Sequence, residues 1–248
     1  MHQNSTCVSY SSTYRKIYRE RLRESDCEAL SESALRAAEN TTKLSELIEV
    51  WAMISAKCGD FAASEVLGSE DPTHSRLMEL PLKDMMKSMA LDTSCREWTG
   101  SPEGFTRVLE RLYQTADVQE QQLIILVLPL LRSQERFLGI ATEAARTNIV
   151  PVFSSLALNN PFPQEHFNEN QWNQMVLKAI FVGCEITRIV GLHERHNSAL
   201  SETIFQYVSE RHSAHRSVPR AVVALCERAL SNTSQLQLNS IKSDLLQD

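Results

Sequence analysis

Apolar residues recur every three to four positions along most of this chain, and no segment alternates strictly between apolar and polar residues. A period near 3.6 residues is typical of one buried face of an α-helix, whereas strict alternation would indicate a β-strand. The clearest early example is a single face formed by Leu44, Leu47, Ile48, Trp51 and Ile54. The hydrophobic pattern therefore predicts an all-α fold.

Capping and turn residues divide this pattern into separate helices. We expect helices at Tyr10–Arg23, Lys43–Lys57, Leu77–Met89, Pro102–Thr115, Asp117–Leu131, Gln134–Thr147, Glu169–Gly183, Asn197–His215 and Pro219–Ser231. A loop is expected over Thr93–Gly104, because the sequence from Thr99 to Pro102 supplies turn residues and the start of the next helix.

Short helices joined by short loops indicate stacked antiparallel helix pairs, either as an irregular α-solenoid or as a compact bundle. The sequence shows no clean internal repeat, so such an array would be irregular. We expect one helical domain over residues 1–230, followed by a polar C-terminal tail, 231–248, that is a loose helix or flexible.

Composition removes several classes of function. The chain has seven glycines and no G-x-G-x-x-G or Walker-type sequence, so we expect no nucleotide cofactor held by a glycine-rich loop. A net charge of −6 does not favour nucleic-acid binding, which requires a basic face. Hydrophobic residues make up 42% of the chain and charged residues 23%, which is typical of a soluble globular protein.

The six cysteines are scattered without a C-x-x-C pair, which indicates reduced thiols and favours a cytoplasmic protein. The N-terminal residues lack the pattern of a signal peptide. The strongest apolar run, Leu123–Leu131, is too short to span a bilayer and contains Pro129, so no transmembrane segment is expected. Two His-x-x-His pairs, at His193 and His212, have arginines beside them that would oppose a cation, and we expect no metal.

The densest group of polar and aromatic residues lies between residues 159 and 197. Prolines 161 and 163 favour an extended entry into the following helix, and the paired amides before them can satisfy loop backbone groups. One interpretation is structural, with a buried Trp172 and amides that tie loop to helix. The alternative is a pocket with Trp172 and Phe181 as its floor, edged by Asn160, His166, Asn173 and Lys178.

The same region carries a resemblance to a known family. Several segments closely resemble the EboA-domain family, with an EboA-like core at about residues 100–220: Asn159-Asn160-Pro161-Phe162-Pro163, His166-Phe167, Trp172–Gly183, and Arg188–Leu192 with Arg195 and Asn197. His193 and His196 are not part of that pattern. This resemblance implies a helical protein encoded among bacterial secondary-metabolite genes and linked to metabolite traffic, without a cofactor. Small fungal pathway proteins that perform cofactor-free cycloadditions on tropolone and sesquiterpene intermediates are similar in general character.

Two hypotheses of function follow. The first is a cofactor-free cyclase of pericyclic, hetero-Diels–Alder-like type, which acts on an apolar polyketide or terpenoid intermediate by positioning and hydrogen-bond polarisation. Its candidate catalytic residues are His166, Asn173, Arg188, His193 and Arg195, and its candidate substrate-binding residues are Asn160, Phe162, Trp172, Lys178 and Phe181.

The second hypothesis is a non-catalytic carrier or adaptor that passes metabolites between pathway enzymes or to a membrane transporter. An adaptor of this kind should expose an apolar patch and bind a protein partner. A small-molecule ligand is expected under both hypotheses, and a homodimer is among the expected assemblies.

Overall fold

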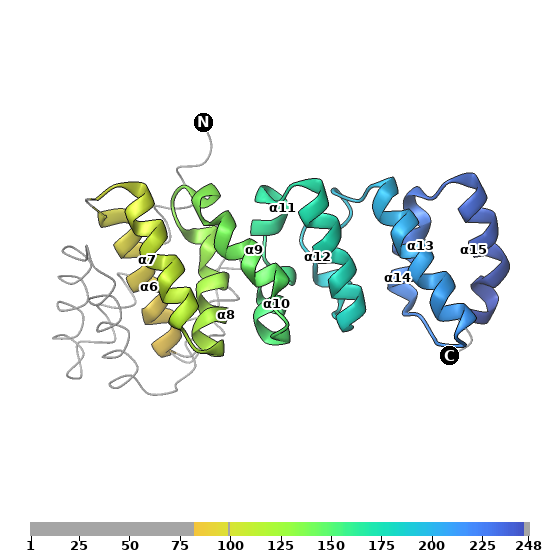
Figure 1. The fold of residues 1–248 in the computed structure, drawn as a ribbon, viewed down its shortest axis with the longest axis horizontal. Coiled ribbons are helices and arrows are strands. Elements are labelled where there is room, and N and C mark those ends of the chain that lie inside the picture. The colour runs from red at the N-terminus through yellow and green to blue at the C-terminus, as the bar shows by residue number, and fades with distance from the viewer. Residues whose placement is uncertain (1–81, 99, 246–248) are drawn as a thin grey trace, which may run out of the picture. The chain divides into compact units, whose positions relative to one another are not determined.

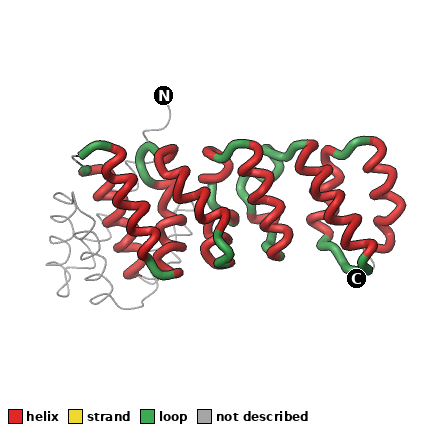
Figure 2. Tube along the Cα trace, viewed as in Figure 1, coloured by secondary structure: helices red, strands yellow, loops and turns green. Residues whose placement is uncertain are grey.

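The computed structural model describes residues 82–98 and 100–245, and within these residues it contains helices, 3-10 turns and loops but no strand (Figures 1 and 2). The all-α prediction is confirmed. The helices predicted at Tyr10–Arg23 and Lys43–Lys57 lie outside the described residues. The chain divides into two compact units, residues 1–140 and 141–248, and each is described by itself. The single helical domain over residues 1–230 stays a prediction.

The described part of unit 1 is built from three α-helices and two 3-10 helices. They are α6 (Leu82–Glu97), α7 (Pro102–Thr115), α8 (Val118–Val127), η3 (Leu128–Leu130) and η4 (Gln134–Phe137), and α9 (Leu138–Arg146) begins here and crosses into unit 2. Phe105 and Leu109 of α7 are buried together with Ile124 and Phe137. Their burial reflects the 3.6-residue spacing of apolar positions, and α7 has the bounds that the sequence predicts.

Three predicted boundaries in unit 1 differ from the structure. The loop expected from Thr93 is wrong, because α6 continues to Glu97 and Arg96 pairs with Asp92 one turn earlier, at 2.8 Å. The predicted helix to Leu131 is also wrong, since α8 ends at Val127 and a 3-10 turn with Pro129 follows. Proline lacks the backbone N–H that a continuing α-helix needs. The first residues of the helix predicted from Gln134 form η4 instead.

Unit 2 contains the rest of α9 and most of the residues of interest. Its further elements are α10 (Val150–Ala157), α11 (Phe162–His166), α12 (Glu169–Val182), η5 (Ile186–Arg188), α13 (Ser198–Ser213), α14 (Arg220–Cys226), η6 (Glu227–Ala229) and α15 (Asn232–Leu245). Helix α10 packs beside α12, and α13 packs on both α14 and α15 (Figure 1). The buried residues Leu156, Val176 and Ile204 contribute to this core.

Helix α12 has signals for both of its ends. Asn168 accepts a hydrogen bond from the Gln171 N–H at 2.9 Å, and the Gln171 side chain accepts one from the Asn168 N–H at 3.0 Å, which is a capping box. Gly183 ends the helix in the left-handed region with φ 79°, where a residue without Cβ is favoured. The predicted helix Glu169–Gly183 is confirmed to within its last residue.

Helices α12 and α13 run in the same direction. The side chains of Asn173 and Asn197 meet near the two N-termini, and the rings of Phe181 and Tyr207 meet near the C-terminal ends. This pair therefore differs from the antiparallel pairs expected from the sequence, because residues 183–197 return along the unit before α13 begins.

The C-terminal segment, for which a loose helix or a flexible tail was expected, is helical in its described part. Asn232–Leu245 forms α15, which packs on α13 and buries Leu238 completely. Glu202 of α13 accepts a hydrogen bond from the Ser231 N–H at 2.8 Å and another from the Ser234 hydroxyl at 2.7 Å. These bonds lower the pKa of the Glu202 carboxyl, and they stabilise the start of α15.

Candidate functional site

The loop between α10 and α11 is held by Asn160. Its side-chain N–H donates to the Ser155 carbonyl at 3.0 Å, and its side-chain oxygen accepts from the Phe162 N–H at 3.0 Å. Asn160 is 2% exposed, so both bonds lie away from solvent. The expectation that these amides satisfy loop backbone groups is confirmed for this residue.

Arg195 joins α11 to α12. One guanidinium nitrogen donates to the backbone carbonyls of Pro163 and Gln164, at 2.9 and 3.0 Å, and the guanidinium carbon lies 4.8 Å from the centre of the Trp172 ring. Burial lowers the pKa of Arg195, while the charge of Glu169 opposes that shift. A charge-assisted bond pair and a cation–π contact therefore hold three segments together.

Trp172 is the largest fully buried side chain of the described residues. Its indole N–H has no hydrogen-bond partner among the residues that the structure describes. The ring contributes its area to the core and offers its face to Arg195. Trp172 thus acts in this structure as a packing residue.

Asn173 and Asn197 form a reciprocal pair of side-chain hydrogen bonds between α12 and α13. Asn197 donates to Asn173 at 2.9 Å, and Asn173 donates back at 3.2 Å. Asn197 also caps α13, because its side-chain oxygen accepts from the Leu200 N–H at 2.9 Å. Together with Asn160, Trp172 and Arg195, this pair forms what we call the buried junction, in which Asn160 and Trp172 are buried and the other three residues are half-buried.

Lys178 occupies a different place on α12. Its ammonium donates to the carbonyls of Ala145 and Thr147, at 2.8 and 2.6 Å, and lies 4.8 Å from the centre of the Phe153 ring. Burial lowers the pKa of Lys178. Carbonyls at the end of a helix carry partial negative charge, so Lys178 caps the end of α9.

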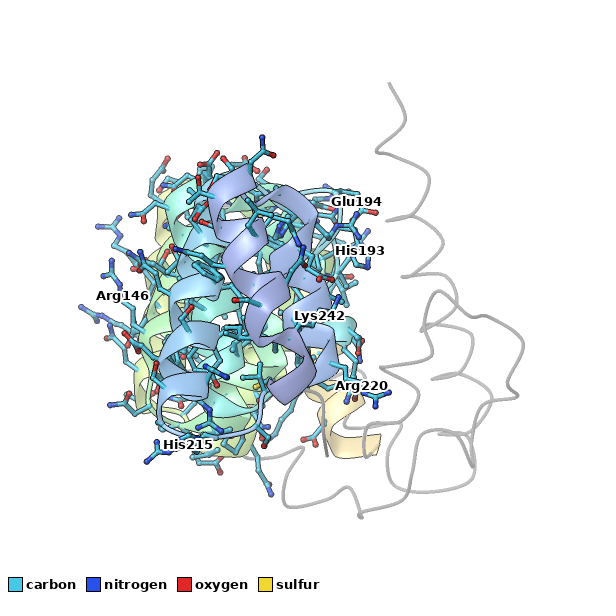
Figure 3. All side chains as sticks on the ribbon, turned by 90° about the vertical axis from the view of Figure 1, so that its right-hand side faces the viewer. Arg146, His193, Glu194, His215, Arg220 and Lys242 are labelled. Carbon is cyan, nitrogen blue, oxygen red and sulfur yellow. The ribbon has the colours of Figure 1, made fainter. Side chains whose placement is uncertain are left out.

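Three of the predicted catalytic residues lie nearer the surface. His166 packs on the buried ring of Phe162, with 4.5 Å between ring centres. With its side-chain amide oriented to satisfy both groups, Asn159 accepts hydrogen bonds from the Arg188 guanidinium and donates one to the Arg188 carbonyl. His193 projects outward beside Glu194 (Figure 3).

The structure does not bring Trp172 and Phe181 to one surface. Nine residues at about 100° each place them on opposite sides of α12. Trp172 is fully buried, whereas Phe181 is 64% exposed and its ring meets Tyr207 edge-on, with 5.0 Å between centres. The predicted pocket floor is therefore divided between the core and the surface.

Exposed apolar residues at one end of unit 2 were not predicted from the sequence. We call this group the apolar end, and it consists of Ile149, Val150, Phe181 and Val182. Lys178 binds the carbonyl of Thr147, and the Ser154 hydroxyl lies 3.7 Å from the Cys184 thiol, so the two segments are neighbours. In the sequence these residues stand as two adjacent apolar pairs, Ile149-Val150 and Phe181-Val182, and the apolar pattern alone does not show that they are exposed.

His196 of the His193-x-x-His196 pair makes an internal contact. Its Nε2 lies 2.6 Å from the hydroxyl of Ser201, which is fully buried, and its Nδ1 is buried without a partner among the described residues. The described residues contain no cluster of three or more His, Cys, Asp or Glu side chains that could hold a metal ion. Nor does any described helix have the length and apolar character needed to cross a membrane.

The fold and these contacts define the class of protein: it is an all-α protein of short packed helices. Side-chain hydrogen bonds connect the segments from α10 to α13. The chain belongs to the EboA family, described as metabolite traffic protein EboA, whose model matches residues 97–227. That match encloses the segment in which the resemblance was seen. No curated protein and no solved structure matches the chain.

Proposed function

We propose that this protein is a non-catalytic adaptor in metabolite traffic. It passes an apolar intermediate from one pathway enzyme to the next or to a membrane transporter. The observation that carries the proposal is the apolar end, where Phe181 is 64% and Val150 47% exposed. Clustered apolar side chains at a surface are typical of docking sites. The family description, a metabolite traffic protein, supports the same role.

The contacts of the predicted catalytic residues support the adaptor as well. Asn173 and Arg195 donate hydrogen bonds to other residues of the protein. The substrate-binding candidates Asn160 and Lys178 do the same. An enzyme that polarises a carbonyl must aim such donors at the substrate. In this structure they hold helices and loops together.

The cofactor-free cyclase is the second candidate function. It is favoured by one observation, the position of Arg188 and His193 at the surface of the family segment, where a donor could reach a ligand. Substitution of these two residues should then lower turnover while ligand binding persists. For an adaptor, the same substitutions leave the metabolites unchanged.

The test compares metabolites inside and outside cells of the producing organism, by mass spectrometry, after deletion of the gene. An adaptor predicts an intact product that builds up inside the cells, and complementation by the wild-type gene but not by Phe181→Ser/Val182→Ser. The matched control is Leu236→Ser, which removes a leucine that is 72% exposed on α15, away from the apolar end. Accumulation of two unjoined precursors, joined by the purified protein alone, would overturn the adaptor and establish the cyclase.

A further inference from the structure

The end of unit 2 that carries the apolar patch also carries a basic segment. Residues 211–220 contain Arg211, His212, His215, Arg216 and Arg220, and no acidic residue. Because α12 and α13 run in parallel, Phe181 and this segment lie at the same end of the unit. In Figure 3, His215 projects at the lower left, where α13 has ended, and Arg220 lies on the right in the lower part of the view, where α14 begins.

Tyr207 connects the two features. Its ring meets Phe181 edge-on, and Arg211 follows one turn later on the same face of α13. Arg211 donates to the Ser217 carbonyl at 2.9 Å, which folds the basic segment back onto the end of α13. Arg216 and Arg220 are exposed beyond this bond. This end of unit 2 thus combines exposed apolar residues with exposed arginines.

We infer that this combined surface docks the protein on an anionic lipid bilayer, with Phe181, Val182, Ile149 and Val150 entering the interface and the arginines facing lipid phosphates. Aromatic and aliphatic tips beside arginine are the chemistry that binds peripheral proteins to acidic membranes. The inference rests on the proposed function, since it names the partner of the adaptor's apolar end.

Charge complementarity favours an anionic partner here even though the whole chain has a net charge of −6. Charges act over a Debye length of about 8 Å at physiological salt, so the local basic segment governs the approach to a surface. The nearest acids in sequence are Glu185 and Glu210, and the Glu185 carboxylate lies 4.0 Å from the Arg188 guanidinium. The three arginines of the segment outnumber them.

The form of the patch favours a bilayer over a partner helix. A helix that binds in a groove is received by apolar residues that run along neighbouring helices. Here the exposed residues are two adjacent pairs, one at the start of α10 and one at the end of α12. Such tips can enter a lipid interface, which requires no complementary shape.

The experiment is cosedimentation of the full chain with phosphatidylcholine vesicles, with and without phosphatidylglycerol. We expect binding to the anionic vesicles alone, and a loss of binding as salt is raised. Phe181→Ser/Val182→Ser and Arg216→Glu/Arg220→Glu should each reduce partitioning by about tenfold or more. The matched controls are Leu236→Ser, and Arg111→Glu, which changes an exposed arginine of unit 1.

Circular dichroism melting of each variant checks that it folds. Equal binding to neutral and anionic vesicles, or an equal loss in the controls, would overturn the inference. If the protein binds no vesicle and the Phe181→Ser/Val182→Ser variant still fails to complement the deletion in cells, membrane docking is wrong. The proposed adaptor function is then retained, with a protein as its partner. If anionic vesicles bind but gene deletion leaves metabolites unchanged, membrane docking stands and the traffic role fails.

Discussion

The buried junction and the apolar end each include residues of α12, and along this helix they reverse the usual distribution of polar and apolar side chains. At the junction, Asn173 makes its hydrogen bonds between two helices, and Arg195 covers a buried indole. At the other end of α12, Phe181 and Val182 face solvent. This contrast shows that polar residues within the segment matched by the family model can be structural, while the surface available to partners is apolar.

The largest expected effect comes from Trp172→Ala. Removing a fully buried indole should lower the free energy of unfolding by about 3–5 kcal/mol, because it leaves a cavity under Arg195. Urea denaturation measures this loss. The matched change is Phe181→Ala on the opposite side of α12, which should cost about 1 kcal/mol or less, mostly from the Tyr207 contact. Similar losses at both positions would break the comparison.

Arg195→Met gives the next largest effect. It keeps most of the apolar stem but removes the donor from the Pro163 and Gln164 carbonyls, so the free energy of unfolding should fall by about 2–3 kcal/mol. Arg188→Met is the control, because the Arg188 side chain is 48% exposed and its ion pair with Glu185 spans 4.0 Å. A loss at Arg195 no greater than at Arg188 would show that the junction is not a structural brace.

Much of the fold could be predicted from local sequence. Ser101, Pro102 and the apolar period after them specify α7, and Asn168 with Gln171 specifies the start of α12. The end of α8 was misplaced because a long apolar run outweighed the signal of Pro129. The C-terminal segment was left open between a loose helix and a flexible tail, because its buried residues Ser234 and Leu238 are covered only where the helix packs on α13.

The candidate site could be predicted only in part. Asn160 bonds to residues within five positions of itself, so its role is visible in the sequence. Arg195 lies 23 positions from Trp172, and only the folded chain shows that one covers the other. The exposure of Phe181 likewise depends on which side of α12 its neighbours cover, and the apolar pattern alone does not contain that information.

The smallest expected effect concerns pH and His196, which lies between two residues of the buried junction in the sequence. His196 adjoins Arg195 in sequence, and burial lowers its pKa, with further lowering by the charges of Arg228 and His193. The folded protein therefore favours the neutral imidazole more than the unfolded chain does. Its contribution to stability is complete above the ordinary pKa of histidine, near 6.5, and is lost as the pH falls through the lower pKa of the folded state.

We therefore expect the free energy of unfolding to decrease on acidification below about pH 6.5. His196→Gln should remove part of that decrease, since an amide can still meet the Ser201 hydroxyl and takes up no proton in this range. His215→Asn is the control, because His215 is exposed with φ 53°, a conformation that asparagine tolerates. Urea titrations at successive pH values measure both slopes. An unchanged slope in His196→Gln, or an equal change in His215→Asn, would mean that the acid sensitivity does not arise at His196.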